Sequence, residues 1–188
     1  MKRFQMFLSI AGLAAIGMLA GCGGSRSAST ATPAGEEPEL DATALDQYKY
    51  FMSEAGLAQS EQRLDDALEN YLSAAQVLEE TGEVSVKQAD AHFQAAEIAY
   101  QRFDKELAIQ QYEKAVGLYL RFPGNSQSKA AVAYTNMGVV YKEMHDKARA
   151  RTCWQQALEV YRNAPESSQN AGHIEKINQN IRDLDEGF

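Results

Sequence analysis

Two cysteines and three histidines are the side chains of this 188-residue chain that most readily support covalent or metal chemistry. A thiolate is a nucleophile and a metal ligand, and an imidazole binds metals or transfers protons. His92, His145 and His173 lie far apart, without a second histidine at the spacing of a metal-binding pair. The pattern therefore predicts no metal, no cofactor and no catalytic residue, so the chain is not expected to be an enzyme. The two thiols, Cys22 and Cys153, need separate explanations.

Cys22 ends the sequence LAGC, directly after an apolar run. Lys2 and Arg3 precede that run, which extends over Phe4–Ala20 with only two polar interruptions. A membrane-spanning helix needs about 20 apolar residues, so the run is slightly short. A basic start, an apolar run and small residues, in that order, are typical of a secretory signal peptide. LAGC resembles the lipobox of bacterial lipoproteins, in which the cysteine thiol receives diacylglycerol and the chain is cut just before it.

This resemblance implies that residues 1–21 are a lipoprotein signal peptide and that Cys22 carries the lipid, palmitate included. Two or more fatty chains, as mature lipoproteins carry, anchor a protein stably, whereas one chain does so only marginally. Gly23 follows the cysteine in place of the aspartate that resembles an inner-membrane retention signal. The expected location is therefore the periplasmic face of a bacterial outer membrane. The alternative is an uncleaved signal anchor with an incidental cysteine.

Residues 22–45 are predicted to be the lipidated N-terminus and a flexible tether. From Gly23 to Glu39 the sequence holds small, polar and breaker residues, which cannot offset the entropy lost on ordering. Without Lys2 and Arg3 the formal net charge changes from −8 to about −10. Such a charge argues against nucleic acid as a partner, because phosphate binding needs clustered cations. Membrane contact is therefore expected through the N-terminal lipid alone.

Beyond the tether the chain repeats itself three times with helical spacing. Each copy has a small residue, then alanine twelve positions later, an aromatic residue four later and alanine three later. The three sets are Ala55, Ala67, Tyr71 and Ala74; Ala96, Ala108, Tyr112 and Ala115; and Gly138, Ala150, Trp154 and Ala157. The alanine and aromatic positions share one helix face. Each ring should therefore be buried beside small neighbours, with Trp154 against Gly138.

This pattern resembles the tetratricopeptide repeat, and its period of 41 and then 42 residues is similar to the long repeats of kinesin light chain. The resemblance implies an all-α fold, with three helical hairpins plus a C-terminal capping helix forming a short right-handed superhelix. The repeat domain should cover residues 46–187. Its parts are expected at about 48–82, 89–123 and 131–165, and the capping helix at about 170–186 with an apolar stripe of Ile174, Ile177, Ile181 and Leu184.

The family usually has glycine at the turn inside each hairpin, and this chain departs from that pattern. The turn positions hold Gln62, Phe103 and His145. Asp104 and Asp146 follow two of these residues and should cap the second helix of their hairpins. Arg63 follows the first, so that turn is the least well specified.

Cys153 occupies the repeat position that holds Asn70 and Gln111 in the other two copies. Because those residues are polar, the thiol is expected to be partly exposed, and Arg149 and Arg151 would lower its pKa. The preferred interpretation is a tolerated small residue beside the core. The alternative is a redox-active thiol.

In the tetratricopeptide family the first helix of each hairpin lines a concave surface that binds extended or helical peptides. Position six of that helix often carries a side-chain amide that bonds the ligand backbone, and the matching residues, all polar, are Ser53, Gln94 and Asn136. The same face should present Met52, Gln59, Phe93, Glu97, Tyr100, Thr135, Val139 and Lys142. The paired lysines of members that bind C-terminal carboxylates are missing, since only Lys142 is a candidate. A neutral or mildly basic, partly apolar segment is the expected ligand.

The resemblances together imply a lipid-anchored, non-enzymatic adaptor that binds a segment of a partner protein. Similar repeat lipoproteins assist assembly of envelope complexes such as pili, secretion systems, outer-membrane insertion complexes and cell-wall machinery. A structural lipoprotein that self-associates into a homo-oligomer, without a peptide ligand, is the main alternative. An envelope redox protein that uses Cys153 is a third hypothesis.

Overall fold

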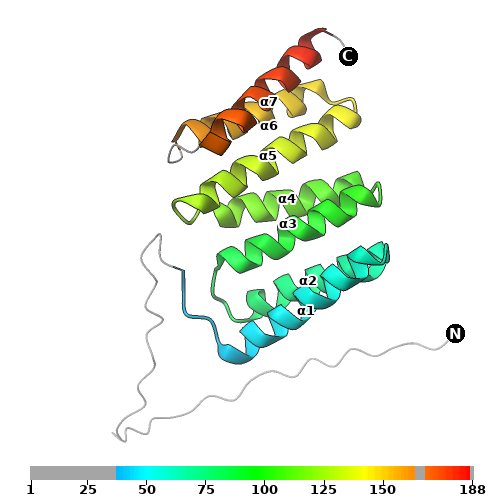
Figure 1. Ribbon diagram of the computed structural model, residues 1–188, viewed down its shortest axis with the longest axis vertical. Coiled ribbons are helices and arrows are strands. Elements are labelled where there is room, and N and C mark those ends of the chain that lie inside the picture. The colour runs from blue at the N-terminus through cyan, green and yellow to red at the C-terminus, as the bar shows by residue number, and fades with distance from the viewer. Residues whose placement is uncertain (1–36, 164–167, 187–188) are drawn as a thin grey trace, which may run out of the picture. The chain divides into compact units, whose positions relative to one another are not determined.

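The computed structural model describes residues 37–163 and 168–186, and in these ranges the chain forms seven helices and no strand. They are α1 (Ala42–Ser60), α2 (Leu64–Glu80), α3 (Val86–Gln101), α4 (Lys105–Tyr119), α5 (Asn125–Glu143), α6 (Lys147–Asn163) and α7 (Ser168–Glu186). The all-α prediction, with three hairpins and a terminal helix, is confirmed (Figure 1). Cys22, the predicted signal peptide and most of the predicted tether lie outside the described residues.

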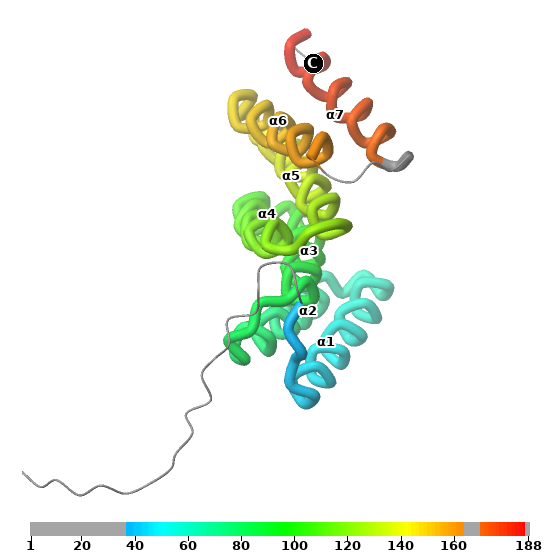
Figure 2. Tube along the Cα trace, turned by 90° about the vertical axis from the view of Figure 1, so that its left-hand side faces the viewer, coloured from blue at the N-terminus to red at the C-terminus, as the bar shows by residue number. Residues whose placement is uncertain are grey.

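The helices stack in chain order. Each hairpin consists of a first helix (α1, α3 or α5) and a second helix (α2, α4 or α6) that pack closely on each other. Each second helix also contacts the next first helix, as α2 does with α3 and α4 with α5. Helix α3 touches α5 directly, and α7 covers the last hairpin (Figures 1 and 2). Residues of α1, α3 and α5 also line one cavity together, so the first helices lie along one face of the stack, here the wall of first helices, on which a groove can be built.

The three hairpin turns use the left-handed backbone conformation without glycine. Gln62, Phe103 and His145 have φ values of 61°, 62° and 61°. The residue after each turn donates its backbone N–H to the carbonyl five residues earlier, as Arg63 does to Ala58 at 2.8 Å. This is the hydrogen-bond pattern of a Schellman helix end. The predicted turn positions are confirmed, and each carries a side chain where glycine would avoid strain.

The helix caps follow the sequence as well. The Asp104 carboxylate accepts a hydrogen bond from the backbone N–H of Leu107 at 3.2 Å. Asp146 accepts one from Arg149 at 2.8 Å, whereas Arg63 provides no side-chain cap to α2. The guanidinium and backbone N–H of Arg149 hold the pKa of Asp146 below its ordinary value, and the N–H bond contributes most. The cap predictions for these helices are therefore confirmed.

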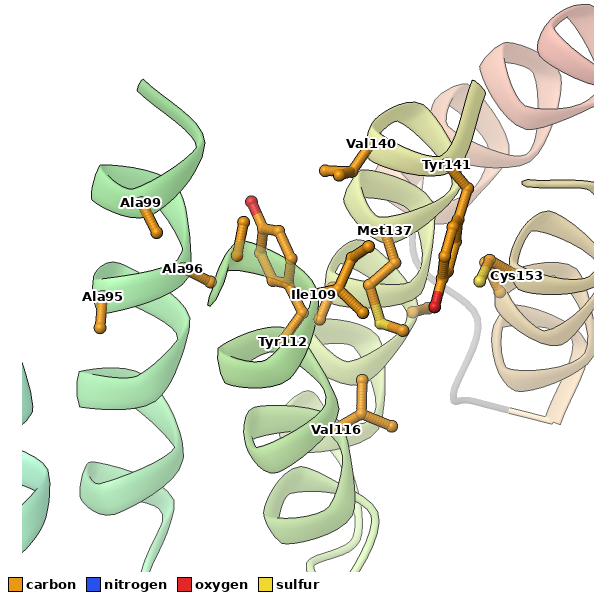
Figure 3. Close-up of a cluster of buried hydrophobic side chains, with 14 of the residues drawn as sticks. Ala95, Ala96, Ala99, Ile109, Tyr112, Val116, Met137, Val140, Tyr141 and Cys153 are labelled. Carbon is orange, nitrogen blue, oxygen red and sulfur yellow. The ribbon is translucent and has the colours of Figure 1, made fainter. Parts of the chain in front are cut away.

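The repeat signature forms the core. Tyr71, Tyr112 and Trp154 are all buried, and the Trp154 ring is completely covered. A Cβ atom placed on Gly138 would lie only 2.2 Å from the indole Nε1, so the ring packs directly on the glycine backbone. Figure 3 shows how Tyr112 fills the space beside the alanines of α3. The predicted register of the second and third repeats is thus confirmed.

Helix α7 closes the end of the stack with an apolar face. Ile177 and Leu184 are buried and belong to the same core cluster as Trp154. Ile174 and Ile181 pack against that cluster and are half-buried. This arrangement confirms the predicted stripe. An amphipathic terminal helix of this kind protects the last repeat from solvent.

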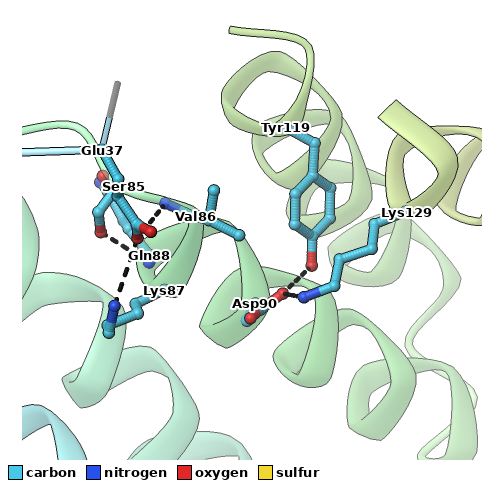
Figure 4. A network of polar contacts seen from close by, with 8 residues as sticks. All are labelled: Glu37, Ser85, Val86, Lys87, Gln88, Asp90, Tyr119 and Lys129. Carbon is cyan, nitrogen blue, oxygen red and sulfur yellow. Dashed lines mark hydrogen bonds and ion pairs between the residues drawn. The ribbon is translucent and has the colours of Figure 1, made fainter. Parts of the chain in front are cut away.

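A short segment before α1 contacts the start of α3. The Glu37 carboxylate accepts a hydrogen bond from the backbone N–H of Val86 at 3.2 Å and lies 3.4 Å from the Lys87 ammonium (Figure 4). Ser85 caps the same helix by accepting from Gln88 at 3.2 Å. A carboxylate at a helix N-terminus interacts favourably with the helix dipole. These contacts fix the end of α3 that borders the groove described next.

Candidate peptide-binding groove

The groove lies on the wall of first helices and contains two cavities. The larger, here the Phe93 cavity, has a volume of about 400 Å3. Its lining residues are Tyr48, Met52, Asp90, Phe93, Gln94, Tyr119, Lys129 and Val132. The smaller, here the Glu97 cavity, has a volume of about 120 Å3 and is lined by Glu97, Tyr100, Tyr112, Asn136, Val139 and Val140. Both cavities are bordered by α3 and α5, so they share one groove.

The Phe93 cavity is mostly apolar, with a compensated ion pair at its edge. The Asp90 carboxylate accepts hydrogen bonds from the Tyr119 hydroxyl at 2.5 Å and from the Lys129 ammonium at 2.6 Å (Figure 4). The Lys129 ammonium also lies 5.6 Å from the centroid of the Tyr119 ring, a cation–π distance. Burial, the bond to Asp90 and its charge raise the pKa of Tyr119, so the phenol stays protonated as a donor. Burial raises the pKa of Tyr48 to about 12.

The Glu97 cavity is built around a carboxylate. Glu97 Oε1 accepts a hydrogen bond from Asn136 Nδ2 at 2.7 Å and another from the Tyr112 hydroxyl. Burial raises the pKa of Tyr112 most, followed by the charge of Glu97. The Tyr100 hydroxyl donates to Glu143, and this bond is the main reason why the pKa of Tyr100 rises to about 12. The cavity therefore combines neutral donors, aromatic rings and one carboxylate.

Seven of the residues expected on the concave face line these cavities. Met52, Phe93 and Gln94 border the Phe93 cavity, and Glu97, Tyr100, Asn136 and Val139 border the Glu97 cavity. Ser53, Thr135 and Lys142 border neither one. Ser53 is exposed on α1, and the Thr135 hydroxyl donates to the Ala131 carbonyl at 2.8 Å. Gln59 accepts a hydrogen bond from Tyr71 at 3.0 Å and so contributes to hairpin packing.

The geometry changes the role expected for Asn136. The sequence predicts an amide that is available to a ligand backbone, but one of its N–H groups already binds Glu97. Within the described residues its carbonyl oxygen accepts no hydrogen bond, so this acceptor remains for a ligand. The Asn136 amide also interacts with the Tyr112 hydroxyl, which opposes the rise in the pKa of that phenol. Gln94, which lines the Phe93 cavity and is half-buried, keeps its whole amide for that purpose.

Sequence reasoning missed five lining residues of the Phe93 cavity. They are Tyr48, Asp90, Tyr119, Lys129 and Val132. A helical signal was present, because Asp90 lies seven residues before Glu97, and Lys129 seven before Asn136, on the same helix faces. Tyr119 likewise lies seven residues after Tyr112. Extending each of these helix faces by two turns would have included three of the five residues, namely Asp90, Lys129 and Tyr119.

The exposure and the lowered pKa expected for Cys153 are wrong, whereas the preferred interpretation, a tolerated small residue beside the core, agrees with its position. Its thiol is only 5% exposed, and burial raises its pKa to about 11, with the Glu113 charge adding to the rise. Arg149 opposes this shift without cancelling it, and Arg151 binds Asp185 instead. The reason is periodicity, because a residue three after Ala150 and four before Ala157 lies on the apolar face of α6. The thiol therefore packs in the core beside Tyr141 (Figure 3).

The equivalent residue of the second repeat is buried as well. Gln111 is 4% exposed, and its Oε1 lies 2.8 Å from Nδ1 of His92. Nε2 of His92 lies 3.1 Å from a Glu79 carboxylate oxygen. The polar side chain at this position thus joins α4 to a buried histidine of α3, rather than facing solvent. Burial lowers the pKa of His92, and the Lys114 charge adds to that effect.

Within the described ranges, no group of three or more histidine, cysteine or acidic side chains is arranged to hold a metal ion. None of the helices in that part of the chain is long and apolar enough to cross a membrane. The residues that line the two cavities offer hydrogen bonds, apolar contacts and charge.

The stacked hairpins and the groove on their first helices define a helical-repeat protein of the tetratricopeptide type, a fold that generally serves as a protein-interaction scaffold. Residues 42–185 match the family described as soluble NSF attachment protein, SNAP. The chain belongs to that family. A search of curated proteins found no match.

Two solved structures share this fold. BtubC (BKLC) from P. vanneervenii aligns with a TM-score of 0.59 and 24% identity, over 81% of this chain and 69% of that one. The N-terminal domain of stress-induced protein-1 (STI-1) from C. elegans aligns with a TM-score of 0.57 and 14% identity, over 74% of this chain and 99% of that domain. At these identities the likeness establishes the fold.

Proposed function

We propose that this protein is a non-enzymatic adaptor that holds a segment of a partner protein in the groove between α3 and α5. The observation that carries the proposal is the pair of adjoining cavities, which open among residues at repeat-equivalent positions of the first helices. Gln94 offers hydrogen bonds to a ligand backbone, while Met52, Phe93 and Val132 offer apolar contact to its side chains. The family description, an attachment protein, agrees with a role in linking proteins.

The adaptor is proposed to be held at a bacterial membrane by lipid on Cys22. The basic start, apolar run and LAGC sequence support this part of the proposal, and Gly23 supports the periplasmic face of the outer membrane. Cells assemble multiprotein machines at that surface, so the proposed role is in building or maintaining one of these envelope complexes. The acidic repeat domain would stay soluble beside the bilayer because of its net charge.

Site-specific photocrosslinking in the native envelope tests the groove. A photoreactive amino acid replaces Gln94 on α3 in one variant and Gln110 in a second variant, and Gln110 is exposed on α4. The expected result is one discrete crosslinked protein from position 94 and none from position 110. Met52→Glu, which places a charge in the Phe93 cavity, should remove that product. Equal products from both positions, or insensitivity to Met52→Glu, would contradict groove binding.

Self-association is the second candidate, and one surface favours it. Tyr50 and Leu57 of α1 are 60% and 50% exposed, and they lie seven residues apart on one helix face. Tyr50 and Phe51 also border a surface hollow at the start of α1. Sedimentation velocity of the full chain in detergent decides the matter. A dimer that dissociates in a Tyr50→Ser, Leu57→Ser double variant would support this candidate, and a monomer at all concentrations would exclude it.

A further inference from the structure

Three polar contacts join α3 to α5 along the groove. The first pairs Asp90 with Lys129 at 2.6 Å, and the second pairs Glu97 with Asn136 at 2.7 Å. In the third, the Tyr100 hydroxyl donates to Glu143. On α5 these partners fall at residues 129, 136 and 143, two helical turns apart on one face. The two cavities occupy the spaces between and beside these contacts.

The three contacts differ in charge. Asp90 is neutralised by Lys129, and Glu143 is neutralised by Lys105, whose ammonium lies 3.3 Å from its carboxylate. Glu97 forms no ion pair within the described residues, and both of its hydrogen-bond donors are neutral. The middle contact therefore leaves a negative charge in the wall of a cavity. A partly buried charge of this kind favours an opposite charge more strongly than a solvated one does.

The surroundings of Glu97 suit a cation at the end of a flexible side chain. The cavity of about 120 Å3 has room for the end of one side chain. Val139 and Val140 offer apolar contact to a methylene stem, and the Tyr100 ring borders the same space. Lysine and arginine have this form, with an apolar stem and a charged head. An aromatic wall adds cation–π attraction for either head group.

We propose that Glu97 binds a lysine or arginine side chain of the partner segment, while an apolar side chain of the same segment enters the Phe93 cavity. This inference rests on the proposed function and specifies the chemistry of the partner. The chain's formal net charge of −8 is consistent with a basic segment, since complementary charge speeds encounter.

The spacing of the two side chains follows from the helices. Phe93 and Tyr100 on α3, like Val132 and Val139 on α5, lie seven residues apart. Seven residues of helix rise about 10 Å. An extended peptide covers about 10 Å in three residues, and a helical one in seven. The apolar and basic residues of the partner should therefore be three positions apart if the segment is extended, or seven if it is helical.

Selection from a random dodecapeptide library displayed on phage, against the full chain in detergent micelles, tests the inference. We expect enriched peptides to share a lysine or arginine at one of these spacings from an apolar residue. Synthetic versions of the enriched peptide, with lysine or with norleucine in its place, then serve as probes in fluorescence polarisation. Norleucine keeps most of the stem and removes the charge.

Glu97→Gln is the decisive variant, because glutamine can still accept hydrogen bonds from Asn136 and Tyr112. It should weaken binding of the lysine peptide by at least about tenfold and leave binding of the norleucine peptide unchanged. The difference between the two effects measures the interaction of Glu97 with the lysine charge. Glu69→Gln makes the same change on an exposed part of α2 and should affect neither peptide. Glu97→Lys should reverse the charge preference, so that a peptide with glutamate in place of the lysine binds more tightly than the lysine peptide.

The outcomes distinguish the charge pair at Glu97 from the adaptor function of the groove. Enriched peptides that bind in the groove but are insensitive to Glu97→Gln would overturn this inference and leave the adaptor function standing. If selection against the wild type enriched no peptide that selection against the Met52→Glu variant did not also enrich, both this inference and the proposed adaptor function would be overturned. Equal melting temperatures for the wild type and Glu97→Gln are required, and a variant that melts much earlier would mean that Glu97 only joins the helices.

Discussion

Gly138 is the position where the repeat register can be tested with a single methyl group. A Cβ atom there would lie 2.2 Å from Trp154 Nε1 and 2.5 Å from Cδ1. Both distances are below any real contact, and the ring is completely buried, so it has no free space into which to move. Gly138→Ala therefore forces the ring or the α5 backbone to shift.

The expected loss of stability has three parts. Overpacking a core typically costs about 1–3 kcal/mol. The indole N–H donates to the Thr135 carbonyl at 3.1 Å, and losing a buried bond of this kind costs about 1–3 kcal/mol. Alanine is favoured over glycine in a helix by about 1 kcal/mol, which offsets part of the loss. The net destabilisation should be about 1–5 kcal/mol, which lowers the melting temperature by about 2–20 °C for a domain of this size.

Gly117 offers a matched control. It lies within α4 and is exposed, and beyond the adjacent turns of its own helix no atom of the described residues lies within 4 Å of an added Cβ. Gly117→Ala should raise the melting temperature, since only the helix propensity changes. Thermal unfolding followed by circular dichroism measures both variants, and fluorescence of Trp154, the single tryptophan, reports on the third repeat. If Gly138→Ala were as stable as Gly117→Ala, the proposed packing of Trp154 would be refuted.

Four further predictions follow from other parts of the chain. Cys22→Ser should leave the uncut precursor in the inner membrane, and normal-sized, membrane-bound mature protein in that variant would contradict lipidation. With Cys22 replaced, Cys153 is the only thiol, and its pKa of about 11 leaves about one part in a thousand as thiolate at pH 8. Iodoacetamide should therefore label Cys153 only after denaturation, and rapid labelling of the native protein would show that the thiol is exposed. Because burial lowers the pKa of His92, the unfolded state binds the proton more readily than the folded state. Urea unfolding should therefore show that the free energy of unfolding falls as the pH drops from 7.5 to 5.5, and His92→Gln should reduce this dependence on pH. Phe103→Gly should stabilise the protein by up to about 1 kcal/mol, because glycine adopts a φ of 62° without strain. The control Gln101→Gly, at the last residue of α3, should destabilise the protein by about 0.5–1 kcal/mol, and a loss of stability in Phe103→Gly would disprove strain at the turn.

The elements of the fold were predictable because their signals are local. The alanine–aromatic spacing around Tyr112 and Trp154 specifies which face of each second helix is buried. The aspartates after two of the turns indicate where the second helices begin. Neither signal needs information from another repeat. Position within a repeat was thus sufficient to locate Gln94 and Asn136 on the wall of first helices.

The chemistry of the groove was not predictable in the same way, because it arises between repeats. Asp90 and Lys129 are 39 residues apart, as are Glu97 and Asn136. No pattern inside one repeat indicates which acid will be neutralised and which amide will be occupied. For Cys153 the comparison between repeats was itself misleading. The polar Gln111 at the equivalent position suggested exposure, but both residues are buried. Burial there depends on the neighbouring first helix, and not on the polarity of the residue at the equivalent position.

The groove and the stability of the stack depend on the same contacts. The Asp90–Lys129, Glu97–Asn136 and Tyr100–Glu143 contacts hold α3 and α5 at the separation that leaves cavities between them. A segment that touches both helices adds to those contacts. It should bind the stacked state and not an opened one, which makes ligand binding and repeat stacking mutually stabilising. Because two of the three contacts are already neutral, the selectivity of the groove for charge is concentrated at the single uncompensated carboxylate of Glu97.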